Sequence, residues 1–523
     1  MNMVNELINE LNRKNNYQLT ENGAVGYKST GSILTDLNFR VSSMRNAISA
    51  DDIDLFVKAM EEDLEYAIKW LFFMRDIRGG MGERDTFQKF YMKYTLRHPE
   101  EAKATFKLVA EFGRWKDVID IINMDIYNTL GGIELVKETL YDDIQKCMEG
   151  KPISLLAKWM PSINASDKAR RQAKRFANNF GMSYDSYRKM LSKLRAYLDV
   201  TEVKTCDNRW DEIDYNKVSS NANKRYTNAF KKHDGERYLE HCNKAMDRTS
   251  NPEVKMHAEV LFPHEIWDKY AKYLGYTYYN YCVKLNSVDM SLEALWKNLA
   301  DLGDCGNTMV VVDGSASMMN GKGSVRPIDI ARSLGVYFAE RCKGEFNNIL
   351  MEFSRDPKLI NLNDCKTLMD KYVKLSKYDD CTSTNIEEVF MLILRTAIVS
   401  EMKQSDLPDR ILIVSDMEFN DATYCTNCSA FSYGMKGLFD ELADRYEQYG
   451  YKLPKLVFWN VNSRTNTIPM TVNEMGVIMV SGFSPNIMSM IMSGQTDPWI
   501  ALKEKLDSKR YDCISDTLKS IRS

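Results

Sequence analysis

The sequence predicts a multidomain chain in which an N-terminal all-α region precedes a C-terminal α/β domain with a doubly wound, mostly parallel sheet. Three observations support this fold class. With 523 residues, the chain is long enough for roughly two or three domains. Between residues 51 and 94, apolar residues recur every three or four positions, which is typical of amphipathic helices. After residue 303, short β-branched runs alternate with helical patterns, which is typical of a parallel sheet.

The N-terminal domain is predicted over residues 1–302. Its first 40 residues are polar and rich in Gly and Asn around 22–32, which predicts an extended arm at 1–40. Helical patterns follow at 51–94, 102–112, 133–147 and 153–160. No strict repeat period is visible, but successive helices of about 10 to 15 residues with short links favour a HEAT-like array.

The C-terminal domain is predicted over residues 303–523. Its first strand, 309–312, is a β-branched apolar run, as expected of a strand buried on both faces. Further strands are predicted at 348–353, 359–362 (a short edge strand), 411–415, 456–461 and 477–480. Helices are predicted between them and after them, at 327–341, 387–402, 437–449 and 498–506.

Polar side chains follow two of the predicted strands. Asp313, Ser315 and Ser317 form a D-x-S-x-S loop after the first strand, and Asp416 follows the strand at 411–415. An acid at the C-terminal end of a buried strand lies where open α/β sheets bind ligands. Carboxylate and hydroxyl oxygens are hard ligands that suit Mg²⁺, Mn²⁺ or Ca²⁺. A polar turn whose serines cap the next helix is the alternative explanation of this loop.

These segments resemble a von Willebrand factor A domain, a Rossmann-like α/β fold, with a metal-ion-dependent adhesion site. That family binds its cation with D-x-S-x-S, a Thr from a second loop and an Asp after a later strand. The resemblance implies a divalent cation, Mg²⁺ with Mn²⁺ or Ca²⁺ as alternatives, held by Asp313, Ser315, Ser317, Thr384 and Asp416. Thr382 is the alternative to Thr384. The resemblance favours Thr384, because that family often has Thr before Asn or Asp at this point and Thr384 directly precedes Asn385. An Mg²⁺ in such a site keeps waters, so an acidic residue of a protein partner could complete the coordination.

A Gly-rich turn at residues 74–85 contains Arg75, Arg78 and Arg84. Guanidinium groups and free N–H groups on such a turn could bind a phosphate backbone. A helix–helix loop with solvated charges is the alternative. The turn resembles the R-x-x-x-G-G-x-G-E-R segment of TROVE-type proteins, the Ro autoantigen family. That resemblance implies a ring of helices and favours RNA over DNA as the ligand.

Longer segments resemble the domain of unknown function 2828 family, over nearly the whole chain from about residue 30 to 515. They are AKWMPS at 157–162, EVKTCDNRWDEIDYNKVSS at 202–220, KRYTNAFKKHDGERY at 224–238 and LFPHEI at 261–266. The family carries no established biochemical activity, so this resemblance implies membership and no function.

Residues 168–195 contain nine bases and one acid, Asp185, in a chain whose formal net charge is -3. Aromatic side chains lie between these bases, among them Phe176, Phe180 and Tyr184. Such a pattern favours phosphate contact combined with stacking on unpaired bases, although a solvated helix face is the alternative. The predicted contacts in this stretch are Lys168, Arg170, Arg171, Lys174, Arg175, Arg188 and Lys189.

The sequence therefore favours a non-enzymatic, RNA-binding ribonucleoprotein component that recruits a protein partner through its A domain. Single-stranded ends or small structured RNA are the expected ligands. The alternatives are a protein-interaction scaffold without an RNA role and, less favoured, a metal-dependent hydrolase, since no general base or nucleophile accompanies the site. Eleven cysteines without a disulfide framework predict a cytoplasmic protein. The sequence contains no apolar stretch of about 18 residues, so we expect no membrane span.

Overall fold

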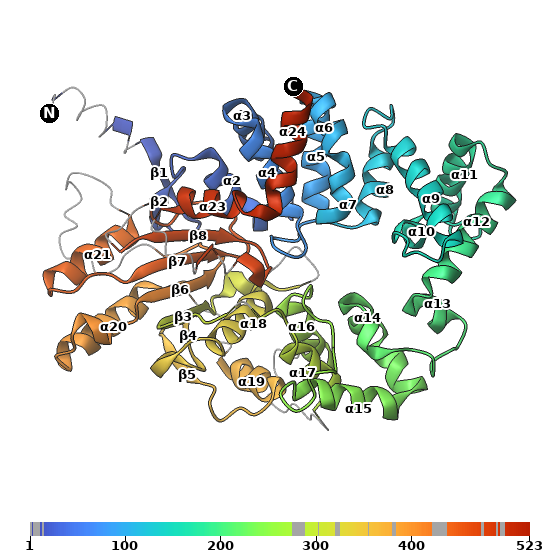
Figure 1. Cartoon of the computed structure of the whole chain (residues 1–523). Coiled ribbons are helices and arrows are strands. Elements are labelled where there is room, and N and C mark those ends of the chain that lie inside the picture. Colours follow the sequence, from blue (N-terminus) through green and yellow to red (C-terminus); the bar gives the residue numbers. More distant parts are fainter. Residues whose placement is uncertain are drawn as a thin grey trace. The chain divides into compact units, whose positions relative to one another are not determined.

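The chain forms two compact units in the computed structural model (Figure 1). The first, here called the sheet unit, comprises Met1–Ala59 and Leu261–Lys505, and the second, the helical unit, comprises Met60–Val260 and Leu506–Ser523. The structure describes residues 3, 11–12, 15–45, 47–274, 288–301, 303–319, 325–353, 355–378, 383–420, 437–471, 475–487, 490–491 and 497–522.

The sheet unit is built on a six-stranded sheet in the order β5-β4-β3-β6-β7-β8. All neighbouring strands are parallel except β5, which runs antiparallel to β4 at the edge. The prediction of a mostly parallel sheet with a short edge strand is thus confirmed. The strands are β3 (Thr308–Asp313), β4 (Ile349–Phe353), β5 (Lys358–Asn361), β6 (Arg410–Ser415), β7 (Lys455–Asn460) and β8 (Val477–Ser481).

Helices cover both faces of the central strands, which explains why β3 is apolar on every side. One face packs against α18 (Pro327–Ala339), where a Cβ on Gly335 would lie only 2.5 Å from Val312. On the other face, Met309 and Val311 share a core with residues of α20 (Glu387–Val399) and α21 (Leu438–Gln448). A strand buried between two layers of helices has no polar face.

The N-terminal residues differ from the predicted extended arm at 1–40. β1 (Tyr17–Leu19) and β2 (Val25–Tyr27) form an antiparallel hairpin, and α2 (Ile33–Met44) packs along β8. The hairpin is fixed to the sheet unit because the backbones of Tyr27 and Ile468 exchange two hydrogen bonds of 2.8 Å. These partners are distant in sequence, so local composition could not reveal them.

The predicted boundary near residue 302, a position outside the described residues, does not separate the two units. Helices before it pack on the sheet unit, as α16 (Pro263–Leu274) does on α18. Within this unit, Glu293 accepts hydrogen bonds from Tyr270 Oη and from the N–H of Leu368 at the start of a later helix. Among the described residues, the remaining α-helices of the unit are α3 (Ala50–Glu62, which runs on into the helical unit), α17 (Met290–Lys297), α19 (Leu368–Leu375) and α23 (Pro498–Leu506).

The helical unit confirms the all-α prediction for the region after residue 60. Its core contains fully buried aromatic side chains, among them Trp70, Phe72 and Tyr91. The C-terminal helix α24 (Asp512–Arg522) also belongs here and packs against α4 and α6. No helix among the described residues is long and apolar enough to cross a membrane. The other helices are α4 (Leu64–Arg75), α5 (Asp85–Arg97), α6 (Pro99–Thr105), α7 (Val109–Phe112), α8 (Trp115–Met124), α9 (Gly132–Met148), α10 (Leu156–Trp159), α11 (Asp167–Phe180), α12 (Tyr184–Leu198), α13 (Thr201–Cys206), α14 (Ser220–His233) and α15 (Gly235–Met246).

Candidate functional site

The two predicted carboxylate ligands lie at the carboxyl ends of neighbouring parallel strands. β3 and β6 are paired from Thr308–Arg410 to Val312–Val414, so Asp313 and Asp416 leave the sheet side by side. The strand order also reverses here, since β4 and β5 lie on one side of this pair and β7 and β8 on the other. Ligands of open α/β sheets bind at such a reversal. The candidate cation site is defined as Asp313, Ser315, Ser317, Thr384 and Asp416.

Asp313 is completely buried and held by its neighbours. Its Oδ1 accepts the N–H of Ser315 at 2.9 Å, and its Oδ2 accepts the hydroxyl of Ser415 at 2.5 Å. The loop after it must be tight, because a Cβ on Gly314 would lie 2.7 Å from Glu352 Oε1. Glu352 is itself fixed by a buried ion pair with Arg332 at 2.8 Å. The glycine of D-x-S-x-S is therefore required by close approach.

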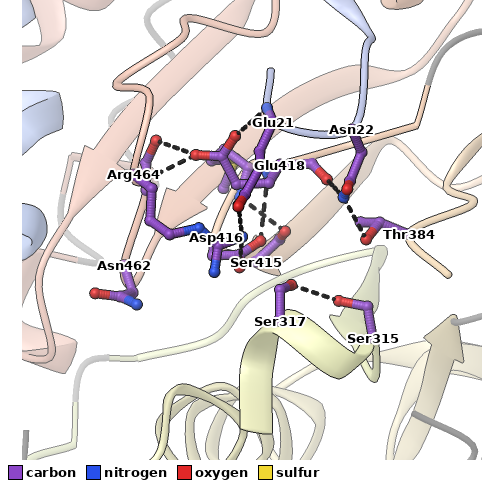
Figure 2. A network of polar contacts seen from close by, with 12 residues as sticks. Glu21, Asn22, Ser315, Ser317, Thr384, Ser415, Asp416, Glu418, Asn462 and Arg464 are labelled. Carbon is purple, nitrogen blue, oxygen red and sulfur yellow. Dashed lines mark hydrogen bonds and ion pairs between the residues drawn. The ribbon is translucent and has the colours of Figure 1, made fainter. Parts of the chain in front are cut away.

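The two serines of the loop contact each other. Ser315 is buried and Ser317 half-buried, and their Oγ atoms lie 2.9 Å apart (Figure 2). Ser317 lies on a short 3₁₀ segment, Ala316–Met319, that follows the strand. Burial raises the pKa of the Asp416 carboxyl, and the nearby Ser317 hydroxyl acts against this rise. The D-x-S-x-S loop thus places both hydroxyls next to the two acids.

Asp416 is completely buried, and one of its oxygens is unsatisfied. Its Oδ1 accepts the N–H of Glu418 at 3.3 Å, whereas its Oδ2 accepts no hydrogen bond and lies 3.4 Å from Arg464 Nη2. Burial raises the pKa of both Asp313 and Asp416, and the charge of Asp416 adds to the rise at Asp313. Two buried acids with an unbonded oxygen form a donor set that fits a cation.

Thr384 is buried just before α20. Its Oγ1 accepts a hydrogen bond from Asn22 Nδ2 at 3.1 Å, and its N–H donates to Asn420 Oδ1 at 3.3 Å. Thr382, the alternative ligand, lies outside the described residues. Where the structure describes the chain, no group of three or more His, Cys, Asp or Glu residues is arranged to hold a metal. The candidate cation site therefore depends on hydroxyl oxygens beside its two carboxylates.

Sequence reasoning missed the residues that surround the site, above all Glu418. This carboxylate is fully buried and accepts the N–H groups of Arg464, Thr465 and Glu21 at 2.7, 2.8 and 2.8 Å. It therefore joins the end of β6, the loop after β7 and the turn between β1 and β2 (Figure 2). A second acid two residues after Asp416 was the available signal, but its partners are remote in sequence.

Of the three arginines of the Gly-rich turn, only Arg75 contradicts the predicted phosphate contact. Arg75 is completely buried, and its Nε and Nη2 donate to Asp117 Oδ2 at 3.1 and 2.5 Å, so it cannot contact RNA. Arg78 is exposed and donates to the carbonyl of Glu111 at 3.0 Å, and Arg84 is exposed and pairs with Asp85 at 2.7 Å. The turn also packs internally, since a Cβ on Gly80 would lie 2.0 Å from the carbonyl oxygen of Phe73.

The bases of α11 and α12 are mostly exposed. Gly181, in the left-handed conformation, ends α11, and Ser183 accepts the N–H of Ser186 to start α12. Lys168, Arg171 and Lys174 have exposed side chains. Arg170 is exposed and pairs with Asp167, and Arg188 and Lys189 are exposed and both pair with Asp185.

Three members of this stretch differ from the prediction. Arg175 is half-buried and donates to the carbonyl of Ile122 at 3.4 Å, so part of its role is structural. Phe176 and Phe180 are buried in the core, which removes them as stacking platforms. Tyr184 is 41% exposed, with Lys174 Nζ 5.2 Å from its ring centre, and stays available for stacking.

Two family models match the chain. The model "Domain of unknown function (DUF2828)" matches residues 20–146 and 166–306, and "Domain of unknown function (DUF7788)" matches residues 307–514. The chain is also similar to "Uncharacterized protein L728" of Acanthamoeba polyphaga mimivirus. The two are 29% identical over 518 residues, which cover 92% of this chain and 85% of the relative. The second model begins one residue before β3, so it contains the whole of the six-stranded sheet.

Proposed function

Since this chain belongs to the domain of unknown function 2828 family, whose description states no activity, we propose its function from its own residues. We propose a non-enzymatic ribonucleoprotein component, whose sheet unit recruits a protein partner through a divalent cation and whose helical unit holds RNA. The observation that carries the proposal is the buried pair Asp313 and Asp416, with an unbonded carboxylate oxygen, at the strand-order reversal.

The ligands of the candidate cation site favour Mg²⁺, with Mn²⁺ or Ca²⁺ as alternatives. Two carboxylates can balance the charge of a divalent ion, and the hydroxyls of Ser315, Ser317 and Thr384 add neutral oxygens. A bound cation would keep an open coordination position, which a carboxylate of a partner can occupy. Within the chain, Ser415 and the N–H of Ser315 hold Asp313 in place for this task.

The sheet supports the interpretation as a von Willebrand factor A domain. If the six strands of this sheet are counted along the chain with β3 as strand 1, their order is 3-2-1-4-5-6, the order of doubly wound folds. The strand at one edge, β5, is antiparallel. For the helical unit, the HEAT-like and TROVE-like interpretation rests on the sequence alone. A cytoplasmic location agrees with the cysteines, because the seven in the described part of the chain are free thiols.

The exposed bases of α11 and α12 favour RNA as the ligand of the helical unit. Lys168, Arg171 and Lys174 present positive charge to solvent, and Lys174 Nζ lies 5.2 Å from the centre of the exposed Tyr184 ring. This combination of phosphate contact and stacking suits single-stranded RNA. A scaffold without an RNA role is the alternative, and co-purifying nucleic acid, seen as a raised 260/280 nm absorbance ratio, distinguishes the two.

Loss of one carboxylate tests the cation site. We expect Asp313→Ala to abolish Mg²⁺ and Mn²⁺ binding to the full chain, because the remaining ligands are one carboxylate and neutral hydroxyls. Calorimetric titration measures the affinity. The full chain is required because the β1–β2 hairpin and α2 belong to the sheet unit.

Asp409→Ala is the matched control, since Asp409 is an exposed acid immediately before β6, at the opposite end of the strand from Asp416. It should bind both ions like the parent chain. Equal divalent affinity in the parent and in Asp313→Ala would show that the site is misassigned.

A further inference from the structure

The turn between β1 and β2 is bound to the segment that follows β6 and to Thr384 of the candidate cation site. Thr20 Oγ1 donates to the carbonyl of Phe419 at 2.6 Å, and the N–H of Glu21 donates to Glu418 Oε2 at 2.8 Å. Asn22 Nδ2 donates both to the carbonyl of Glu418 at 2.5 Å and to Thr384 Oγ1 at 3.1 Å. The backbone of the turn is therefore anchored without any contribution from the Glu21 side chain.

The Glu21 carboxylate lies instead on Arg464. The guanidinium of Arg464 pairs with Glu21 and also lies 3.4 Å from the unbonded Oδ2 of Asp416 (Figure 2). Side-chain exposure falls along this series, from 54% for Glu21 through 36% for Arg464 to zero for Asp416. Arg464 thus connects the solvent-exposed acid with the buried acid of the site.

We propose that Arg464 and the candidate cation form a two-point receptor for a carboxylate, and that Glu21 now fills the Arg464 half of it. The protein partner then binds through an acidic side chain that displaces Glu21. This inference rests on the proposed function, because the other half of the receptor is the cation. It adds a guanidinium contact for the partner's carboxylate and an internal residue that competes with that carboxylate.

The geometry of Arg464 suits this role. A guanidinium offers paired N–H donors that match the two oxygens of a carboxylate. A cation on Asp416 would place a second positive charge beside Arg464, and such a surface attracts acidic partners and repels basic ones.

Displacement of Glu21 is also inexpensive. Exposed ion pairs contribute little net stability, so an incoming carboxylate can replace Glu21 without a large cost. The turn stays in place meanwhile, because its hydrogen bonds come from Thr20, Asn22 and the backbone. Glu418 is not a second internal ligand, since its carboxylate already accepts hydrogen bonds from the backbone of Arg464, Thr465 and Glu21.

The test uses the full chain saturated with Mg²⁺ and the peptide acetyl-Gly-Gly-Glu-Gly-Gly-amide, compared with its Gln counterpart. Calorimetry or NMR titration measures both affinities. The Glu peptide should bind the parent chain weakly and Glu21→Gln several-fold more tightly, because the internal competitor is gone. It should bind Arg464→Gln at least about tenfold more weakly than the parent, because a charge-assisted contact is lost. The Gln peptide should bind none of them.

Controls separate the receptor from general charge effects. Glu447→Gln removes an exposed acid elsewhere on the sheet unit and should leave peptide affinity at the parent value. Arg464→Lys keeps the charge but loses the paired donors, so its affinity should fall between those of the parent and Arg464→Gln. If Arg464→Gln fails to fold, Arg464→Lys and Glu21→Gln decide the question.

Unchanged peptide affinity in Arg464→Gln or in Glu21→Gln would overturn the receptor. Failure of the proposed function looks different, because the parent chain would then bind no Mg²⁺ in the absence of peptide. Arg464→Gln should retain Mg²⁺ binding, since it removes a positive charge 3.4 Å from a ligand and no ligand itself.

Discussion

Asp416 is completely buried, yet one of its two carboxylate oxygens has no hydrogen bond. Nearly all buried polar atoms in proteins have a partner, so such an oxygen needs an explanation. The ion pair with Arg464 at 3.4 Å supplies part of one, and a divalent cation shared with Asp313 would supply the rest. Both explanations place a positive charge at the same atom, which is why Arg464 and the cation are expected to influence each other.

The buried acids also predict how stability depends on pH. Burial raises the pKa of Asp313 from its ordinary 3.8 toward about 7, so the folded chain binds this proton more tightly than the unfolded chain. Without a cation, the free energy of unfolding should therefore fall as pH rises from about 4 to about 7, and stop falling above that. Thermal unfolding in EDTA across this range measures the effect.

Mg²⁺ should oppose this fall in the free energy of unfolding, because it binds the deprotonated acids. It should therefore stabilise the chain more at about pH 7.5 than at about pH 5. Asp313→Asn, which cannot titrate at this position, serves as the control and should lose the part of the pH dependence that comes from Asp313, whereas Asp416, whose pKa burial also raises, should keep its own part. If the stability of the parent chain in EDTA does not fall as pH rises, the raised pKa values of the two buried acids are contradicted.

Single residues of the site were predictable where they directly follow a recognisable strand, because the end of the strand then fixes their position. Asp313 and Asp416 directly follow apolar runs, and the ends of neighbouring parallel strands meet at one edge of a sheet. Arg75 shows the opposite case. Its charge and its Gly-rich surroundings are typical of a phosphate contact, but its buried partner Asp117 lies 42 residues later. Only packing decides whether such an arginine faces solvent or an internal acid.

At the level of elements, patterns that reflect burial were reliable and patterns that depend on distant partners were not. β3 was predicted at 309–312 and extends over Thr308–Asp313. It was predictable because a run of apolar side chains indicates a strand that is covered on both faces. β1 and β2 have three residues each, and a strand that short carries no periodicity. Phe176 and Phe180 lie four residues apart on one helix face, which is the spacing of a core, and both are buried.

The exposed face of α11 yields a prediction about RNA. Replacing Lys168, Arg171 and Lys174 by Glu should weaken the binding of single-stranded RNA by orders of magnitude, because all three side chains are exposed. If three phosphate contacts are lost, the slope of log affinity against log salt should become less steep by about 2. Sequence preference should change little, since phosphate contacts do not read bases. Filter-binding titrations at several salt concentrations measure both quantities.

Lys89, Lys103 and Lys107 provide the matched control, since they are exposed bases on other helices of the same unit. Their replacement by Glu changes the net charge equally and should have a much smaller effect. Equal losses in both triple variants would indicate a general charge effect, and a parent chain without salt-dependent RNA binding would leave the scaffold alternative.

On the scale of the whole molecule, the course of the chain could not be predicted from local patterns. Helices α16 and α17 precede the predicted boundary but belong to the sheet unit, and the C-terminal helix α24 belongs to the helical unit. An amphipathic pattern shows that a helix has an apolar partner surface without showing which surface it is. The two family models divide the chain at residues 306 and 307, close to the predicted boundary, whereas the compact units do not.

The return of the C-terminus to the helical unit yields the last prediction, which concerns Tyr511. Its ring is fully buried, stacks on Phe112 at 5.5 Å and meets the edge of Phe73 at 6.1 Å. Its hydroxyl donates to Asp76 Oδ2 at 3.1 Å, beside the ion pair of Asp76 with Arg510. Tyr511→Ala should destabilise the helical unit by about 3–5 kcal/mol, the usual cost of a large cavity. Tyr511→Phe keeps the ring and should cost about 1–3 kcal/mol, because Asp76 loses one donor.

Hydrogen exchange measured by mass spectrometry locates the effect, while thermal unfolding gives its size. Protection should fall in residues 60–260 and in α24, because the cavity opens between Phe73, Phe112 and the C-terminal segment. Mg²⁺ binding at Asp313 should persist, since every residue of the candidate cation site belongs to the sheet unit. If protection falls equally in both units, the C-terminal segment stabilises the whole chain, which would contradict the prediction that the effect is confined to the helical unit.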